Sequence, residues 1–422
     1  MNFDDTLQEA AFRAKVRAWI DSNAPKHLEE PLSKLGFGQR DIEGYDDTID
    51  LSRDWQKKKA EAGFACLQWP LEFGGGGLGP MERVIWGQEE GAYAALHFPF
   101  SVGQGMCGPT MLAWASEADK KRYLPPIVSG EEIWCQLFSE PGCGSDLAGV
   151  RTRAERATDG SGDWIINGQK IWTSYAQYSD FGLIITRTDQ DVPKHKGLTA
   201  FFLDVHAPGV EMRPIKQANG DSEFNEVFFT DVRVPDSQRL GDPGQGWQVA
   251  LTTLMNERLS IGSGIPTGFE ELLDFCRTAT VGDVPALDDP MVRSRLAYFA
   301  ARSRGLAYTS MRSISALSKG EMPGPENSIG KLVAGAMMQE IATFALDLQG
   351  PAGALFGNEF DPAASFQAMV LRSPATRIEG GSDEILRNII AERVLGLPGD
   401  IRVDKTATFR ELSTGGGLAA QG

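Results

Sequence analysis

Cysteine and histidine are scarce in this sequence. The 422 residues include five cysteines and four histidines, with no CxxC pair and no two histidines spaced as ligands on one helix face. An odd number of scattered cysteines argues for a reducing compartment and against a structural zinc site. So few histidines also argue against a metal centre or a catalytic triad built on histidine.

Positive charge is in short supply as well. The chain carries 41 Lys and Arg against 57 Asp and Glu, which gives a formal net charge of -16. Nucleic-acid binding depends on contacts from Lys and Arg to phosphate, so this composition argues against it. A phosphorylated cofactor is still compatible with the charge, because backbone N–H groups at helix starts can bind phosphates.

The sequence pattern favours neither a signal peptide nor a membrane span. Residues 1–10 are acidic where a signal peptide would be basic and then apolar. Residues 91–116 carry no Asp, Glu, Lys or Arg, but Pro99, Pro109 and three glycines interrupt them. We therefore predict two short buried helices here, no membrane segment and a cytoplasmic protein.

The hydrophobic spacing changes twice along the chain. Residues 5–130 show apolar side chains at helical spacing, and this spacing returns after Gly244. Between them lie short runs typical of strands, separated by turn clusters such as Asp159–Gly162. We predict an α+β fold with an N-terminal helical domain (1–132), a middle antiparallel β-barrel or sandwich domain (133–240), a C-terminal four-helix-type bundle (241–400) and a flexible tail (401–422).

Individual elements follow from the same spacing. Helices are expected at Leu7–Ile20, Leu51–Ala62, Trp247–Ser263, Pro290–Lys319, Ser328–Leu348 and Ser382–Leu395. Strands are expected at Val150–Arg156, Trp164–Ile166, Gly182–Thr186, Leu198–Val205 and Glu226–Val234.

The first segment with chemical interest is Leu137–Asp146, at the start of the middle domain. Gly142 and Gly144 allow a ligand to approach the main chain closely, and Ser139 and Ser145 supply hydroxyl groups. Such a segment could bond the edge of a flat heteroaromatic ring. Taken alone, an ordinary turn is the simpler interpretation.

A second segment, Gly168–Ser174, follows at a distance suited to a neighbouring strand. The indole of Trp172 offers a rigid apolar wall, although a lone Trp in a strand is by default a core aromatic. Both segments resemble the two flavin-contacting stretches of the acyl-CoA dehydrogenase family. Residues 377–398 resemble the C-terminal signature of that family, and with the matching domain order the resemblance extends over about residues 5–398.

The resemblance implies an FAD cofactor and a known type of reaction. Members of the family convert an acyl-CoA thioester to the 2-enoyl-CoA, in lipid metabolism: a carboxylate removes the α-proton and hydride leaves the β-carbon for flavin N5. It also implies a homodimer or homotetramer and an electron-transferring flavoprotein as acceptor. By position, the cofactor contacts would come from Leu137, Phe138, Ser139, Gly144, Ser145, Trp172, Thr173, Ser174, Ser382 and Glu384.

Two glutamates compete for the role of the base. Many family members carry the base in the loop before the last helix, a position that falls on Gly380 when counted back from Arg387. Glu379 is one residue early, and neighbouring residues of an extended loop point in opposite directions. The resemblance instead gives the Gly380 backbone N–H the role of hydrogen-bond donor to the thioester oxygen, where enolate charge develops.

A second subgroup, which includes isovaleryl-type enzymes, carries the base on the first helix of the C-terminal bundle, just before an arginine. Glu257, followed by Arg258, matches that position, and these are the only charged residues between 247 and 265. A carboxylate on such an apolar helix face is desolvated, which makes it a stronger base. The simpler alternative is a buried pair that orders the helix, but adjacent helical residues do not face each other. We therefore predict Glu257 as the base and a structural role for Arg258.

The sequence departs from the family where the adenosine half of FAD would bind. The usual Arg-x-x-Phe-Gly segment, which reaches the FAD of a neighbouring subunit, is replaced by Phe275–Gly282, and Arg277 is a weak substitute. The adenine-side glutamine falls on Asp347. These departures favour a mixed oligomer. Three alternatives stay open: a non-catalytic subunit that completes the flavin site of a partner, a flavin monooxygenase on the same fold, against which Glu257 argues, and an oxidase. Because Gly380 leaves space, we expect a branched, long or bulky acyl group, including steroid side chains.

Overall fold

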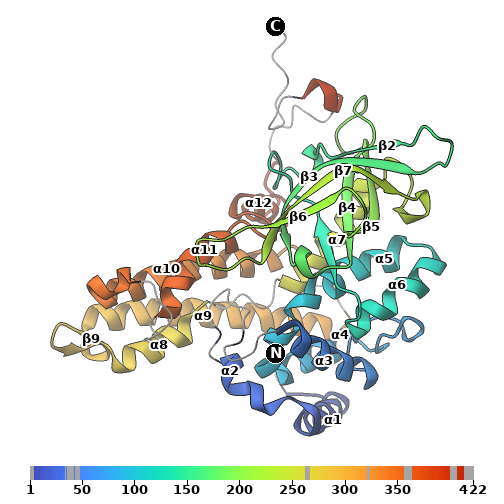
Figure 1. Cartoon of the computed structure of the whole chain (residues 1–422). Coiled ribbons are helices and arrows are strands. Elements are labelled where there is room, and N and C mark those ends of the chain that lie inside the picture. Colours follow the sequence, from blue (N-terminus) through green and yellow to red (C-terminus); the bar gives the residue numbers. More distant parts are fainter. Residues whose placement is uncertain are drawn as a thin grey trace.

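The computed structural model describes residues 4–33, 35, 42, 48–261, 267–320, 324–355, 364–399 and 406–412. Helices come first along the chain, a sheet follows, and helices return, as Figure 1 shows from blue through green to red. The predicted α+β fold class is therefore confirmed.

Short and medium helices build the N-terminal part. The main ones are α1 (Leu7–Asn23), α3 (Thr48–Glu61), α4 (Pro80–Glu89), α5 (Gly108–Trp114) and α6 (Glu117–Ser129). Residues 91–116, where we predicted two short helices, form a 3-10 helix (Gly91–Phe100), a π-helix (Gly103–Cys107) and α5. The extra π-helical turn lies between Pro99 and Pro109, which restrict the backbone on either side.

The middle part is an eight-stranded sheet in the order β6-β7-β3-β2-β4-β5-β8, with β1 beside β4. Its strands are β1 (Trp134–Leu137), β2 (Arg153–Arg156), β3 (Trp164–Ser174), β4 (Phe181–Arg187), β5 (Leu198–Asp204), β6 (Val210–Pro214), β7 (Phe224–Val234) and β8 (Arg239–Leu240). Most neighbours pair antiparallel, but β1 and β2 both pair parallel with β4, which the prediction missed.

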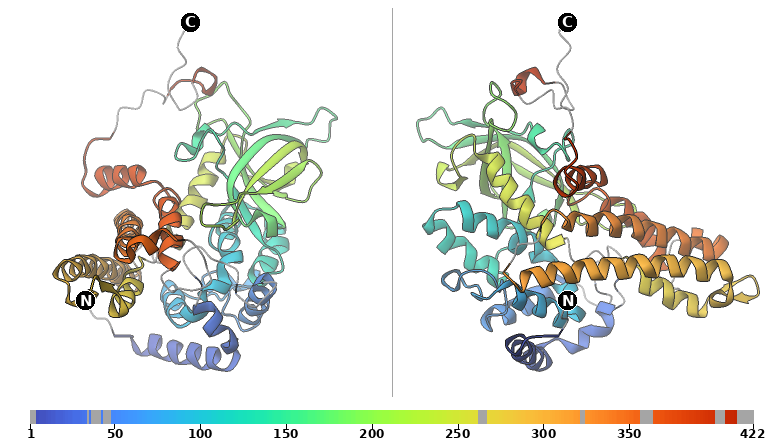
Figure 2. Two further views of the ribbon diagram at one scale, coloured as in Figure 1. Left: turned by 60° about the vertical axis from the view of Figure 1, so that its left-hand side comes forward. Right: turned by 180° about the vertical axis from the view of Figure 1, so that it is seen from behind.

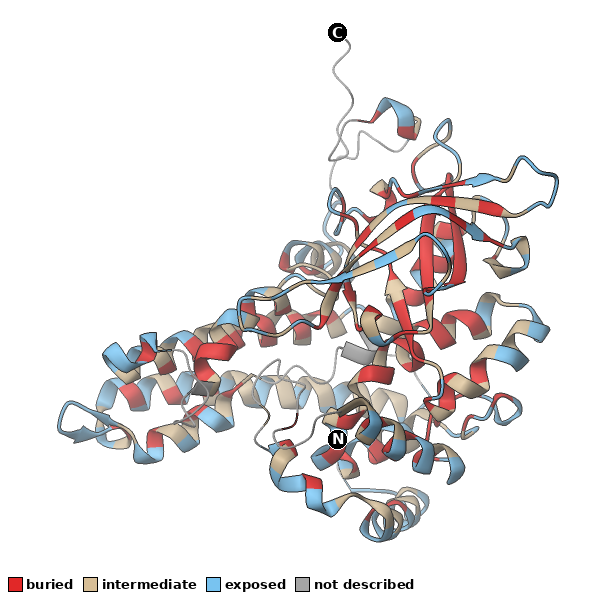
Figure 3. Ribbon diagram, in the orientation of Figure 1, coloured by how far each residue is buried: buried red, intermediate tan, exposed pale blue. Residues whose placement is uncertain are grey.

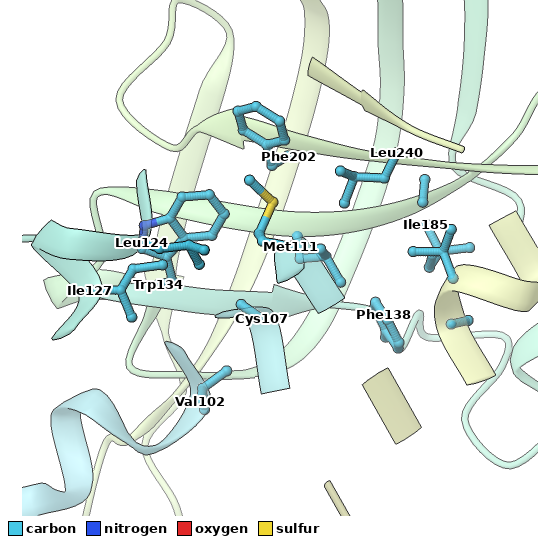
Figure 4. Close-up of a cluster of buried hydrophobic side chains, with 14 of the residues drawn as sticks. Val102, Cys107, Met111, Leu124, Ile127, Trp134, Phe138, Ile185, Phe202 and Leu240 are labelled. Carbon is cyan, nitrogen blue, oxygen red and sulfur yellow. The ribbon is translucent and has the colours of Figure 1, made fainter. Parts of the chain in front are cut away.

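One hydrophobic core joins the helices to the sheet. Figure 4 shows Met111 of α5 and Leu124 of α6 among side chains from the sheet, including Trp134 and Phe202. Phe138 belongs to the same cluster, so the first predicted flavin segment is anchored in this core. Figure 3 shows that burial concentrates along the strands and where helices face them.

The α-helices described in the C-terminal part are α7 (Gly246–Ile261), α8 (Phe269–Thr278), α9 (Pro290–Leu317), α10 (Asn327–Gln349), α11 (Ala364–Thr376) and α12 (Asp383–Ile389), and a short hairpin of β9 (Thr280–Val281) and β10 (Val284–Pro285) follows α8. Figure 2 shows α9 and α10 side by side in a long arm. The segment from Asn327 to Ala354 has the length and hydropathy of a membrane span, but α10 packs its apolar side chains into a core with α8, α9 and α11. The predicted helix end at Ser263 lies outside the described residues.

A short C-terminal stretch returns to the sheet. We expected a flexible tail over 401–422, yet Phe409 is buried, with its ring 3.7 Å from the guanidinium of Arg187. The Phe409 N–H also donates to the Val192 carbonyl at 2.9 Å. Residues 406–412 are therefore held by a cation–π contact and backbone bonds. Residues 400–405 and 413–422 lie outside the described part of the chain.

Candidate functional site

The two segments predicted to contact a flavin lie side by side. The Ile171 N–H donates to the Ser139 carbonyl at 2.9 Å, and the Lys170 ammonium donates to the Phe138 carbonyl at 3.0 Å. Lys170 also pairs with Glu140 at 2.8 Å. Spacing along the sequence suggested neighbouring strands, and these bonds show how the segments are joined.

Exposure differs along the first segment. Leu137 and Phe138 are buried, Ser139 is half-buried, and Gly144 and Ser145 are exposed. The segment therefore passes from the core to the surface within a few residues, so that its later part is accessible to a ligand.

Trp172 does not behave as a core aromatic. Its side chain is 56% exposed, although it lies in β3 beside an irregularity in the β3–β7 register. Its backbone φ is +60°, a left-handed conformation that is strained for a bulky residue and is found most often at functional sites. The edge of Phe224 approaches the indole at 6.1 Å and 90°. A broad apolar surface of the indole is therefore open to a ligand.

Thr173 and Ser174 follow Trp172 with different exposure. Thr173 is buried, and its hydroxyl has no hydrogen-bond partner among the described residues. Its carbonyl accepts a bond from the Asn225 amide at 3.1 Å. Ser174 is half-buried. A buried hydroxyl without a partner is costly, so a ligand atom that reached it would be stabilising.

Glu257 is half-buried on α7. The Gln136 side-chain amide lies 3.5 Å from its carboxylate, and Gln136 immediately precedes Leu137 of the first segment. On the same helix Thr253 is fully buried and bonds Thr110 of α5 at 2.9 Å. The first contact joins α7 to the strand that leads into the segment with Ser139, and the second joins α7 to α5. The side chain of Arg258 lies outside the described residues.

The loop before α12 forms a tight turn. Gly380 and Gly381 have φ values of +63° and +101°, which favour glycine over any residue with a side chain. Ser382 caps α12 as predicted, since its hydroxyl accepts from the Ile385 N–H at 3.4 Å. Glu384 is exposed in the first helical turn, and hydrogen bonds from its own N–H and the Ser382 hydroxyl lower its pKa.

Glu379, the rival candidate for the base, pairs with Arg372. The distance from the Arg372 guanidinium to the Glu379 carboxylate is 2.8 Å, and Glu223 lies 3.5 Å from the same guanidinium. Burial by itself lowers the pKa of Arg372, but the two carboxylates outweigh it and raise the pKa. Arg372 thus joins the sheet to the C-terminal helices. The sequence offered no local signal for this contact, because Glu223 lies far away along the chain.

Comparison with known proteins agrees with this arrangement. Profiles described as the N-terminal, middle and C-terminal domains of acyl-CoA dehydrogenase match residues 6–131, 135–232 and 244–395. The acyl-CoA dehydrogenase IpdE1 of Mycolicibacterium smegmatis is 39% identical over 411 residues, which cover 94% of this chain and all of that protein. The chain belongs to the acyl-CoA dehydrogenase family. It is an enzyme of that class.

Solved structures of acyl-CoA dehydrogenases have the same fold. The Tcur3481-Tcur3483 steroid ACAD superposes with a TM-score of 0.76 at 27% identity, covering 95% of this chain and 100% of that chain. The ChsE4-ChsE5 complex from Mycobacterium tuberculosis also superposes with a TM-score of 0.76 at 27% identity, covering 95% of this chain and 100% of that chain.

Acyl-CoA dehydrogenases are flavoproteins, and the residues present fit a flavin. A Cβ added at Gly142 or Gly144 would meet no atom within 4 Å, so the main chain there faces open space. Trp172 adds an open apolar wall, and within the described part of the chain the Thr173 hydroxyl has no hydrogen-bond partner. An aromatic wall beside exposed main chain and hydroxyls suits a flat ring with polar edges.

Proposed function

We propose that this chain catalyses the FAD-dependent α,β-dehydrogenation of an acyl-CoA thioester, with Glu257 as the base. The observation that carries the proposal is the position of Glu257. Its carboxylate lies against Gln136, one residue before the first flavin segment, while Glu379 is paired with Arg372. Glu257 thus contacts the strand that leads into the first flavin segment, whereas Glu379 is engaged by the Arg372 guanidinium.

Each group has a distinct part in the proposed reaction. Bound FAD would supply a hydride acceptor, held by the segments that carry Ser139 and Trp172. Glu257 accepts the α-proton, and the Gln136 amide orients its carboxylate. The Gly380 N–H donates to the thioester oxygen, where negative charge develops as the proton leaves.

The acyl group is proposed to be bulky, with a steroid side chain as the leading candidate. Gly380 places no side chain where many relatives have a loop glutamate, and this leaves room beside the reacting carbons. The solved neighbour Tcur3481-Tcur3483 is named a steroid ACAD. Anaerobic reduction of bound flavin by a panel of straight, branched and steroid acyl-CoA thioesters tests this, because the preferred substrate reduces it fastest.

A mixed oligomer is the proposed assembly. Both solved neighbours are named as pairs of different chains, and the adenosine-side residues of this chain depart from the family pattern. Arg277 is exposed and pairs with Asp274 on its own helix at 3.1 Å. The electron acceptor is proposed to be an electron-transferring flavoprotein, and the location cytoplasmic.

The decisive experiment compares two single substitutions in the flavin-loaded enzyme. Glu257→Gln should keep bound FAD and lose about two or more orders of magnitude in the rate of flavin reduction, the usual effect of removing a general base. Glu379→Gln is the matched control and should retain most of the rate. The assignment is wrong if Glu257→Gln stays active while Glu379→Gln is inactive. If neither variant loses rate, a different group is the base, and if the parent itself shows no flavin reduction, the chain is a non-catalytic subunit.

A further inference from the structure

Lys331, on the second turn of α10, is a buried cation beside the turn that carries Gly380. Its side chain is almost fully buried, and its ammonium donates to the Gly381 carbonyl at 2.7 Å. Helices α10 and α12 pack together, which brings Lys331 to a turn 50 residues further along the chain. No sequence motif marked this residue.

The turn depends on its neighbours for its orientation. Gly380 and Gly381 have no side chains to anchor it, and glycine adopts many backbone conformations. Beyond the glycines, the Asp383 N–H donates to the Arg377 carbonyl at 3.0 Å, and the two side chains pair at 2.7 Å. The Lys331 bond is thus a side-chain contact that holds the glycine part of the turn directly.

Charged groups on neighbouring elements interact electrostatically with the Lys331 ammonium. They are Asp383 on α12, Glu379 and Arg377 beside the glycines, and Glu257 on α7. Burial lowers the pKa of Lys331, and the three carboxylates oppose this effect. Lys331 is therefore a cation within electrostatic range of both the proposed base and the turn.

We propose that Lys331 is a positioning residue for the thioester-binding turn: its buried ammonium holds the Gly381 carbonyl and thereby the orientation of the adjacent Gly380 N–H. This inference rests on the proposed function, in which that N–H stabilises the enolate oxygen. Without Lys331, the glycine turn can adopt other orientations. The Gly380 N–H then points for less of the time at the thioester oxygen, where negative charge develops.

The test follows proton removal without turnover. A 3-thiaacyl-CoA has sulfur in place of the β-carbon, so no hydride can leave, while its α-protons can still exchange with D2O. Exchange catalysed by the flavin-loaded enzyme is followed by mass spectrometry. Lys331→Met should slow exchange by about 10- to 100-fold, somewhat less than deleting an oxyanion donor outright. The dissociation constant of the analogue should change by less than about threefold, because the donor acts mainly on developing charge.

Two further variants distinguish the loss of the hydrogen bond to Gly381 from a general loss of stability. Lys331→Gln keeps a donor for the Gly381 carbonyl without the charge and should recover part of the lost rate. Lys59→Met removes another buried lysine, which pairs with Glu90 at 2.8 Å in the N-terminal part. It should lower the melting temperature and leave the exchange rate of the folded enzyme unchanged.

The outcomes separate this inference from the proposed function. If the parent enzyme exchanges and Glu257→Gln does not, but Lys331→Met exchanges like the parent, the role of Lys331 is refuted while the proposed function stands. If Lys59→Met slows exchange as much as Lys331→Met does, the effect is one of general stability and the inference is also refuted. If the parent enzyme itself does not exchange the α-protons, both the proposed function and the role of Lys331 are refuted.

Discussion

At the scale of single residues, the buried pair of Lys170 and Glu140 joins the two flavin segments. The side chains are 0% and 7% exposed and lie 2.8 Å apart. Glu140 also accepts from the N–H groups of Arg151 and Thr152 at 2.6 and 2.9 Å. Burial raises the pKa of Glu140, but the Lys170 ammonium and these donors outweigh it, so the pKa lies below its ordinary value of 4.5.

This lowered pKa predicts how stability depends on pH. A carboxylate whose pKa is lower in the folded chain stabilises the fold fully above about pH 4.5, and the contribution is lost as pH falls through the folded pKa. Glu140→Gln leaves the Lys170 ammonium buried without its partner, so we expect a loss of about 3–5 kcal/mol at pH 7. The loss should shrink below about pH 4.5. Urea unfolding between pH 3 and 7 measures both effects.

An exposed ion pair provides the control for Glu140→Gln. Asp159 pairs with Arg233, and both side chains are 48% exposed. Asp159→Asn should change stability much less, because water already solvates the charges. If both variants lost the same free energy of unfolding, burial of the Lys170–Glu140 pair would not increase its contribution to stability.

Single residues also show where inference from the sequence ends. Ser139, Trp172 and Glu257 could be named as candidates because the segments around them resemble motifs of the acyl-CoA dehydrogenase family. Arg372 and Lys331 could not, since their contacts join segments that lie far apart along the chain, such as Glu223 with Arg372. Only the packing of α10, α11 and the sheet brings these groups together.

At the scale of elements, long amphipathic helices and buried strands were predictable, and short ones were not. Helix α9 begins at Pro290 as expected, with Asp289 as its cap. Strand β1 has four residues and β6 is largely exposed, so neither has enough alternation to be recognised. Helices α8 and α11 were missed as well. The predicted last helix, Ser382–Leu395, divides into α12 and a π-helix at Ile390–Val394.

The C-terminal stretch 406–412 is predicted to be held in place mainly by the side chain of Phe409. Phe409 covers the Arg187 guanidinium, which donates to the carbonyls of Ala148 and Lys194 at 2.6 and 2.5 Å. Phe409→Ala removes a cation–π contact worth about 2 kcal/mol when desolvated, which should speed hydrogen exchange of this stretch about 30-fold. Exchange at the Phe409 and Arg410 amides, measured by mass spectrometry, reports the opening.

Arg410→Ala is the matched variant for this stretch. Arg410 pairs with Asp191 at 2.9 Å, but the side chains are 66% and 71% exposed. Surface ion pairs contribute about 1 kcal/mol or less, so exchange should rise less than about fivefold. If Arg410→Ala increased hydrogen exchange as much as Phe409→Ala does, the aromatic contact of Phe409 would not be what holds the stretch.

At the scale of the whole molecule, the middle and C-terminal parts of the chain meet at the proposed site. The sheet supplies both flavin segments, α7 supplies Glu257, and Arg372 links the sheet to the turn before α12. The order of the three parts was predictable because the hydrophobic period changes at each boundary. The parallel pairing of β1 and β2 with β4 was not, since strand direction within a sheet depends on contacts between distant segments.

The proposed mixed oligomer predicts how the chain discriminates between flavins. FMN shares the ring and the first phosphate of FAD and lacks the adenosine half. If a second kind of chain supplies the adenosine contacts, this chain alone should bind FAD and FMN with dissociation constants within about threefold. Adding an acyl-CoA dehydrogenase chain that carries the Arg-x-x-Phe-Gly segment should then favour FAD at least about tenfold, or about 1.4 kcal/mol. Fluorescence titration of each flavin measures both ratios.

Arg277→Ala tests the competing possibility that copies of this chain complete the site for one another. Arg277 is the weak substitute for the missing arginine, and it lies exposed on α8. If it reached the FAD of a second copy, the chain alone would already prefer FAD at least about tenfold, and the substitution would remove that preference. We expect no such preference and no effect of Arg277→Ala on either dissociation constant, because the exposed Arg277 pairs with Asp274 of its own helix.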